Sequence, residues 1–226
     1  MKVNNIKEYA ELFKSYLKKG DVDSILYKYE NLKVFRGNWD IEDLDLKSTF
    51  DKSFDSKISN QLWGGSVNSA KSMMLMFLDH NKEFCRSMFK DLFNSEKDLA
   101  MRINRFSFHC DELLDEIMKT TEKINDHFHT PKVISLYLCF NDPAQYCIID
   151  YPAFSAMLKL LETKNVPEPY ELDRCLKLSK GLFSILSKDE ELVGLYKSTL
   201  PEKYQTEFNM LMVHDYYLFN TRMNNQ

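Results

Sequence analysis

One stretch of the chain comes close to a phosphate-binding loop. The residues GSVNSAKS, at positions 65–72, differ by one substitution from the pattern G-x-x-x-x-G-K-[ST]. In a working loop the second glycine lets backbone N–H groups surround the phosphates, and here Ala70 takes its place. Such a loop also follows a buried strand, whereas the preceding SNQLW is a poor strand. We therefore predict that Lys71 binds no nucleotide.

The same stretch is better explained as the start of a helix. Gly64-Gly65 interrupts the chain, and Ser66, Asn68 or Ser69 can cap the first turn. We expect Lys71 to lie exposed in that turn. The residues that would bury one face of this helix are Ala70, Met73, Met74 and Phe77.

A second pattern suggests metal-dependent hydrolysis. Asp150, followed by Glu162 and Lys164, fits the loose D…E-x-K spacing of nucleases that hold a metal on two carboxylates and place a lysine beside the phosphate. That chemistry requires the Glu and the Lys on a strand beside the one bearing the Asp. The residues between Asp150 and Glu162 instead have helical periodicity, which would leave Lys164 in a loop. A nuclease is therefore an alternative, not the main prediction.

Histidines next to acidic and sulfur-bearing residues form the third pattern. His127 and His129 lie one residue apart, Asp126 precedes them, and His109-Cys110 lies upstream. A metal site can be drawn from these residues. However, two His at i, i+2 do not share a helix face, and no further spacing completes a tetrahedral set. We expect a polar loop, with no metal and no cofactor.

No serine or cysteine lies in a G-x-S-x-G nucleophile motif, so we expect no enzymatic activity. Cations near an aromatic residue instead have the composition of a nucleic-acid contact made through phosphates and stacking. Scattered surface charge is the simpler alternative. The candidate DNA-contact residues are Lys57, Trp63, Lys71, Arg102, Arg105, His127 and His129.

Composition narrows the class of protein. The chain has 226 residues, of which 44% are hydrophobic and 13% aromatic, enough for a compact core. The net charge of −4 argues against a general polyanion binder but allows a local basic face. Five isolated cysteines indicate reduced core thiols. Because no signal peptide or membrane-spanning run is visible, we expect a cytoplasmic protein that does not contact membranes.

Hydrophobic periodicity predicts the elements that would carry these residues. Helices are expected at 6–17, around 22–29, through 84–93, at 99–117, at 154–161, at 172–186 and at 204–219, with a loop and a short helix within 34–59. The runs VISLYLCF (133–140) and QYCIIDY (145–151) read as a small β-hairpin, although the first could equally be a buried helix. We predict one mainly α-helical domain over 1–226, with peripheral helices at 1–60 and a helical core at 61–220.

Several longer stretches resemble a known family. LWGGSVNSAKSMMLMFLDHN, MFKDLF, RINRFSFHCDELL, HFHTPKVISLYLCFNDPAQYCIIDYPAF and KLSKGLFSILSKDEEL are similar to the amino-terminal region of McrB-like restriction proteins, over most of residues 60–215. In that family an AAA+ GTPase follows, and the amino-terminal domain recognises the target, often modified DNA. The resemblance names no site residue, and the helical composition departs from the β-rich modified-base readers of the family.

The resemblance implies a targeting domain of a bacterial restriction or phage-defence system. We therefore predict a non-catalytic domain that binds DNA, including modified duplexes, for a downstream AAA+ GTPase module and a nuclease subunit. The alternative is a helical protein-interaction, oligomerisation or phage-signal-sensing module, which dispersed surface cations would favour. The metal-dependent nuclease using Asp150, Glu162 and Lys164 is the enzymatic alternative.

Overall fold

A computed structural model describes residues 1–19, 23–56, 62, 69–119 and 124–224. Helices dominate, and the described residues contain no strand, which confirms the mainly α-helical prediction. The elements are α1 (Val3–Leu17), α2 (Asp23–Asn38), α3 (Leu46–Ser53), α5 (Ala70–Phe93), α6 (Leu99–Met118), α7 (Pro131–Asn141), α8 (Tyr151–Leu160), α9 (Leu172–Leu186), α10 (Glu190–Thr199), the 3₁₀ helix η1 (Glu202–Glu207) and α11 (Leu211–Met223).

The chain forms two compact units. Unit 1 comprises residues 1–26 and 135–226, and unit 2 comprises residues 27–134. Both passages of the chain from one unit to the other fall inside helices, within α2 and within α7. This division differs from the predicted boundary at residue 60. Helix α1 buries one face, on which Ile6 and Phe13 are fully buried. That residues 1–226 fold as one domain stays a prediction.

The predicted hairpin at 133–151 is wrong. Its first run forms α7, and its second run is an irregular buried segment that leads into α8. Residues 134–140 are all buried, so the run has no polar face from which a period could be read. Pro131 occupies the first helical position, where its missing N–H and fixed φ favour a helix start. The buried-helix alternative is therefore confirmed.

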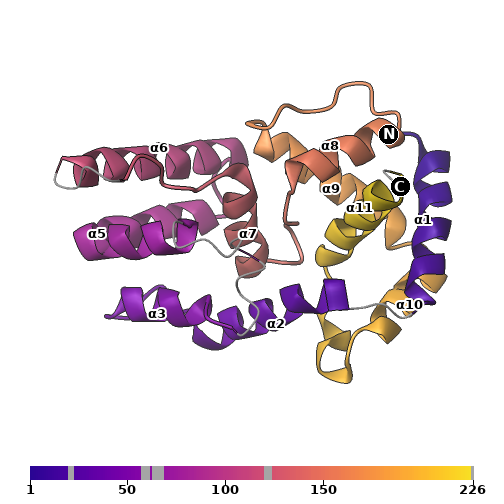
Figure 1. Ribbon diagram of the computed structural model, residues 1–226, viewed down its shortest axis with the longest axis horizontal. Coiled ribbons are helices and arrows are strands. Elements are labelled where there is room, and N and C mark those ends of the chain that lie inside the picture. Colours follow the sequence, from indigo (N-terminus) through magenta and orange to yellow (C-terminus); the bar gives the residue numbers. More distant parts are fainter. Residues whose placement is uncertain (20–22, 57–61, 63–68, 120–123, 225–226) are drawn as a thin grey trace. The chain divides into compact units, whose positions relative to one another are not determined.

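Helices α5 and α6 form the centre of unit 2 and lie side by side, with α3 along α5 (Figure 1). Ser69 and Ser72 form a capping box at the start of α5, as the predicted helix start requires. The predicted apolar face is also confirmed, because Ala70, Met73, Met74 and Phe77 are buried. A kink interrupts α5 at Asn81, whose side chain accepts a hydrogen bond from the N–H of Phe84 at 3.1 Å.

A cluster of aromatic rings fills the space between α3 and α5. The Trp39 ring lies 5.3 Å from that of Phe89, and the Phe50 ring lies 4.9 Å from that of Phe54, measured between centroids. Arg86 of α5 donates hydrogen bonds to the backbone carbonyls of Ile41 and Asp43, which fixes the loop before α3. These contacts hold one side of α5, while its other side packs on α6.

Unit 1 is organised around α11, whose residues 211–217 are all buried. Tyrosine hydroxyls at the ends of long side chains tie this helix to distant parts of the chain. Tyr216 donates to the carbonyl of Ile6 at 3.1 Å, and Tyr217 donates to the carbonyl of Ile148 at 2.9 Å. Because buried hydroxyls need partners, these bonds specify the packing of α11 as well as stabilising it.

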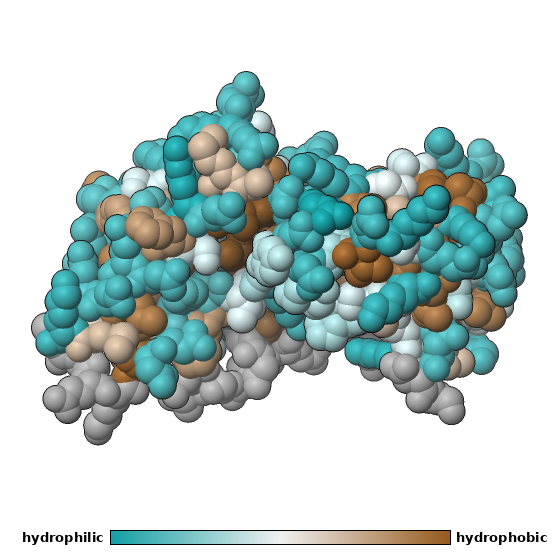
Figure 2. Space-filling model, turned by 90° about the horizontal axis from the view of Figure 1, so that it is seen from above, coloured by the Kyte–Doolittle hydropathy of each residue, from teal (hydrophilic) through white to brown (hydrophobic). Residues whose placement is uncertain are grey.

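All five cysteines lie in the described part of the chain, and each is a buried free thiol, in agreement with the predicted core role. None of the described helices combines the length and apolar character needed to cross a bilayer. The face in Figure 2 is mostly hydrophilic, with apolar side chains visible in small separate patches.

Candidate functional site

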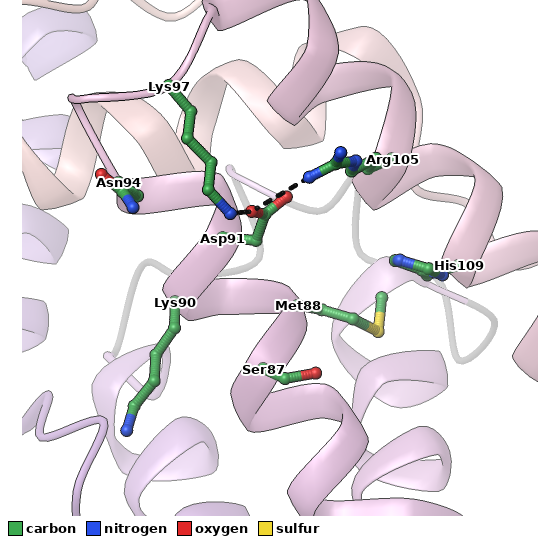
Figure 3. Close-up of a pocket in the computed structure, with 8 residues that line it drawn as sticks. All are labelled: Ser87, Met88, Lys90, Asp91, Asn94, Lys97, Arg105 and His109. Carbon is green, nitrogen blue, oxygen red and sulfur yellow. Dashed lines mark hydrogen bonds and ion pairs between the residues drawn. The ribbon is translucent and has the colours of Figure 1, made fainter.

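A pocket of about 460 Å³ lies in unit 2 where α5 ends and α6 begins (Figure 3). Its walls come from the last turns of α5, the connection after it, and the first half of α6. The predicted contact residue Arg105 belongs to this pocket. The full lining consists of Ser87, Met88, Lys90, Asp91, Asn94, Lys97, Arg105 and His109.

One carboxylate and two cations form the centre of the pocket. Asp91 pairs with Lys97 and, at 3.5 Å, with the Nη1 atom of Arg105. Figure 3 shows both cationic side chains reaching toward Asp91. The hydrogen bond from Lys97 is the main cause of a lowered Asp91 pKa, so this carboxylate is ionised at neutral pH. Lys97 and Arg105 nevertheless remain 40% and 48% exposed, and together they carry one positive charge more than Asp91 neutralises.

Lys90 and His109 extend the polar wall. The Lys90 side chain points away from Asp91 in Figure 3 and pairs with Glu42 at 2.7 Å. The Met88 side chain extends toward the His109 ring in Figure 3, and the Nδ1 atom of His109 is 2.8 Å from a carboxylate oxygen of Glu112. Lysine, arginine and histidine N–H groups beside a small apolar surface are suited to an anionic ligand such as a phosphate group.

Lys71 is bound into unit 2 rather than free in solvent. Its ammonium pairs with Asp51 at 2.7 Å and donates to the carbonyl of Phe54 at 3.3 Å, and its side chain is 17% exposed. The expectation of an exposed Lys71 is therefore wrong, because α3 and its C-terminal end cover the first turn of α5. Residues 65–68 of the phosphate-loop pattern lie outside the described residues.

The burial of two predicted DNA-contact residues is at odds with that role. Arg102 is 3% exposed and donates to the carbonyl of Leu92 at 2.7 Å, where a cation satisfies the C-terminal end of α5. His129 is 2% exposed, and its ring lies 5.8 Å from the Phe77 ring. Neither side chain can reach a duplex without unfolding of its surroundings. The other two residues predicted for the same role, Lys57 and Trp63, lie outside the described residues.

The structure brings the two histidines of the DHFHTP segment to a cysteine of α6. Ligand atoms of Cys110, His127 and His129 all lie within 4.8 Å of one another. Cys110 is fully buried, and the His127 side chain is 14% exposed. Burial, with a smaller contribution from His127, lowers the pKa of His129 to about 3, so its ring is neutral at neutral pH. The three side chains thus offer the donor atoms of a metal site.

Local backbone geometry positions the two rings. His127 and His129 lie in an irregular segment before α7, not in a helix, so the predicted polar loop is confirmed while the helix-face argument against a shared site does not apply. Phe128 between them has φ of 58°, a left-handed conformation that is unfavourable for a bulky residue. The His129 N–H donates to the Nδ1 atom of His127 at 2.9 Å, and the His127 Nε2 atom lies 3.2 Å from Asp111.

The residues proposed for a nuclease do not meet. Asp150 precedes the ten-residue helix α8, and Glu162 follows it, so about 15 Å of helix separates them. Glu162 takes the left-handed conformation common after a helix end and pairs with Lys2 at 2.6 Å. Lys164 is exposed in the following turn. One metal ion cannot bind both carboxylates, so the two-carboxylate arrangement is not formed.

Sequence reasoning missed most of the pocket. Lys90, Asp91 and Lys97 were not among the candidates, although MFKDLFNSEKD places both lysines around the Asn-Ser turn between two predicted helices. That clustering of charge at a helix junction is a readable signal. A search of protein-family models, of curated proteins and of solved structures found no match to this chain.

Proposed function

We propose that this chain is a non-catalytic recognition domain that binds DNA phosphates through the pocket at the α5–α6 junction. The observation that carries the proposal is the charge ratio in this pocket, where Lys97 and Arg105 share the single carboxylate of Asp91. An incoming phosphate would find two exposed cations held close together. Arginine and lysine contacts to phosphates position a protein on DNA without reading its sequence.

The resemblance to McrB-like proteins supports the biological setting. In that setting the domain would deliver a downstream AAA+ GTPase module and a nuclease subunit to foreign DNA, including DNA with modified cytosine. Arg105 is the described member of the predicted contact set that lines the pocket, with Lys71 and His127 elsewhere in unit 2. We therefore place the primary phosphate contact at Lys97 and Arg105.

The proposal is tested by binding of plain, methylated and hydroxymethylated duplexes at two salt concentrations. We expect Lys97→Ala and Arg105→Ala each to weaken binding several-fold and to reduce the dependence of log K on log salt by about one unit. The matched control is Lys177→Ala in unit 1, because Lys177 is also an exposed lysine, 64% accessible, with one carboxylate partner, Asp173. The control should bind as the wild type does.

Comparing the affinities for the three duplexes distinguishes phosphate binding from recognition of a modified base. Equal affinity for all three would keep phosphate binding and remove recognition of a modified base. A loss in Lys177→Ala as large as that in Lys97→Ala would contradict the pocket as the contact site. Complete absence of binding would contradict a DNA-recognition function and leave the protein-interaction alternative.

A groove in unit 1 favours that alternative. It measures about 640 Å³ and lies between α1 and the end of α9, and its apolar lining includes Val3, which is 48% exposed. Charged residues line it as well, and protein interfaces commonly combine apolar and charged side chains. The apolar members are Val3, Ile6, Ala10, Ile185 and Leu186, and the charged members are Lys7, Glu11, Lys188 and Asp189.

A further inference from the structure

The cysteine and histidines beside α6 have the composition of a transition-metal site. Cys110 comes from the middle of α6, and His127 and His129 come from the segment before α7, so two elements supply the three donors. Their ligand atoms already lie within 4.8 Å of one another. In a tetrahedral zinc site, bonds of about 2.0–2.3 Å place ligand atoms roughly 3.3–3.8 Å apart. To close the site, the ligand atoms would have to move closer together and the His129 N–H would have to leave the Nδ1 atom of His127.

We propose that Cys110, His127 and His129 bind one zinc-class metal ion, with water in the fourth position. A thiolate and two imidazoles form a mixed sulfur and nitrogen donor set, which selects zinc or a chemically similar ion over magnesium or calcium. As the metal bond to Sγ of Cys110 forms, the thiol proton leaves to solvent, while both imidazoles bind as neutral rings.

Asp111 supplies the outer partner that such a site needs. In the neutral His127 ring, Nδ1 accepts a hydrogen bond from the His129 N–H, so the proton lies on Nε2 and faces the Asp111 carboxylate at 3.2 Å. This tautomer leaves the Nδ1 lone pair for a metal, which would replace the His129 N–H. A carboxylate that accepts from the second nitrogen of a ligating histidine is the usual support of a zinc site.

A different role for His129 competes with this proposal. Its ring lies 5.8 Å from the Phe77 ring and 6.0 Å from the Phe106 ring, so it could serve only as an aromatic core residue. That role accounts for the position of His129 but not for the approach of His127 and Cys110 to it, nor for the pairing of His127 with Asp111. Metal binding distinguishes the two roles, because a core residue requires no metal.

The test is a titration of the metal-free full chain with Co²⁺, followed by displacement with Zn²⁺. We expect one equivalent to bind, with the visible bands of a four-coordinate ion and a near-ultraviolet band from the thiolate–cobalt bond. Cys110→Ser should remove the thiolate band. Cys175→Ser, which changes a buried thiol of unit 1 rather than unit 2, should keep it. Zn²⁺ should raise the melting temperature of the wild type by a few degrees.

Substitutions at exposed residues provide a second test if Cys110→Ser fails to fold. Asp111 is 64% exposed, so Asp111→Ala should leave the fold intact and weaken metal binding tenfold or more. Glu112→Ala is the matched control, because Glu112 is the next residue of α6 and pairs with a different histidine, His109, at 2.8 Å. A thiolate band that survives Cys110→Ser, or equal affinity in Asp111→Ala and Glu112→Ala, would overturn the proposal.

Discussion

Two ionic clusters, one in each unit, have opposite charge ratios. In unit 1 the ammonium of Lys14 contacts three carboxylates, those of Glu11, Asp189 and Glu191, at 2.8–3.1 Å. In unit 2 the carboxylate of Asp91 contacts two cations, Lys97 and Arg105. The first cluster has an excess of negative charge around a satisfied cation. The second has an excess of positive charge beside a pocket.

Burial separates the roles of the two clusters further. The Lys14 side chain is 6% exposed, so its charge is held in place by its partners and cannot turn toward a ligand. Burial lowers the pKa of Lys14, but the carboxylates outweigh it and hold that pKa above its ordinary value. Lys97 and Arg105 are far more exposed and can exchange Asp91 for an incoming anion. The same ion-pair chemistry thus encloses a buried cation in unit 1 and leaves two exposed cations around one carboxylate in unit 2.

The largest effect is expected from Lys14→Met. Methionine keeps most of the aliphatic stem but leaves three carboxylates without their shared cation, so we expect the free energy of unfolding to fall by about 1–3 kcal/mol. Urea denaturation measures it. Lys18→Met is the matched control, because Lys18 is 57% exposed and its ion pair within the described residues is with Glu191. A control that destabilises as much as Lys14→Met would show that burial does not distinguish the two lysines.

Lowering the pH should change the free energy of unfolding by a smaller amount. Burial raises the pKa of Asp189, but hydrogen bonds from Lys14 and backbone N–H groups outweigh it and lower that pKa. The hydrogen bonds from Lys18 and then Lys14 likewise lower the pKa of Glu191. Carboxylates with lowered folded-state pKa values stabilise above about pH 4 and lose that contribution as pH falls. The stability gap between wild type and Lys14→Met should therefore narrow from pH 6 to pH 3; an unchanged gap would contradict the ionic origin.

Asp91→Asn tests the cluster of unit 2 by removing its carboxylate. Removing the shared carboxylate leaves Lys97 and Arg105 without a counter-charge, so we expect DNA affinity at low salt to rise roughly two- to fivefold. Fluorescence anisotropy at two salt concentrations measures this change, and the gain should shrink at the higher salt. Asp173→Asn, which removes the carboxylate beside Lys177 in unit 1, is the control and should leave affinity unchanged. Weaker binding by Asp91→Asn would contradict the cationic pocket.

The smallest effect is expected where the charge ratio is one to one. In the part of the chain that the structure describes, Lys71 pairs with the carboxylate of Asp51, which is 53% exposed. Lys71→Ala should therefore lower the free energy of unfolding by less than about 1 kcal/mol, measured by the same urea titration. We also expect no change in nucleotide binding. A measured ATP or GTP affinity that this substitution abolishes would restore the phosphate-loop interpretation of residues 65–72.

Helix α9, which has one clear apolar face, could be predicted from the sequence, whereas the buried helix α7 could not be told from a strand. The interval predicted for α9, 172–186, matches the helix, because its apolar residues recur at a helical period. Helix α7 is buried along most of its length, so its sequence has no polar face to set a period. Helix α10 was missed, although Asp189 followed by two glutamates is a readable helix start, and the Asp189 side chain does accept from the Leu192 N–H at 3.0 Å.

For the candidate sites too, some features could be predicted from the sequence and others could not. The burial of Arg102 could have been read from the sequence, because Arg102 lies four residues before Phe106 and eight before Cys110, on the apolar face of α6. The meeting of Cys110 with His127 and His129 could not, because a segment of irregular structure carries the histidines back to α6. Sequence periodicity does not predict which part of the fold an irregular segment will contact. The long-range contact is therefore the part that only the structure supplies.

The order in which the units appear along the chain has a consequence for synthesis on the ribosome. Unit 2 is inserted between the two segments of unit 1, so its residues emerge as one continuous stretch. Helix α1 emerges before them, yet Ile6 receives its hydrogen bond from Tyr216, 210 positions later. At translation rates of about 5–20 residues per second, unit 2 is complete several seconds before that partner exists. The nascent α1 therefore remains without its native packing on α11 during that interval.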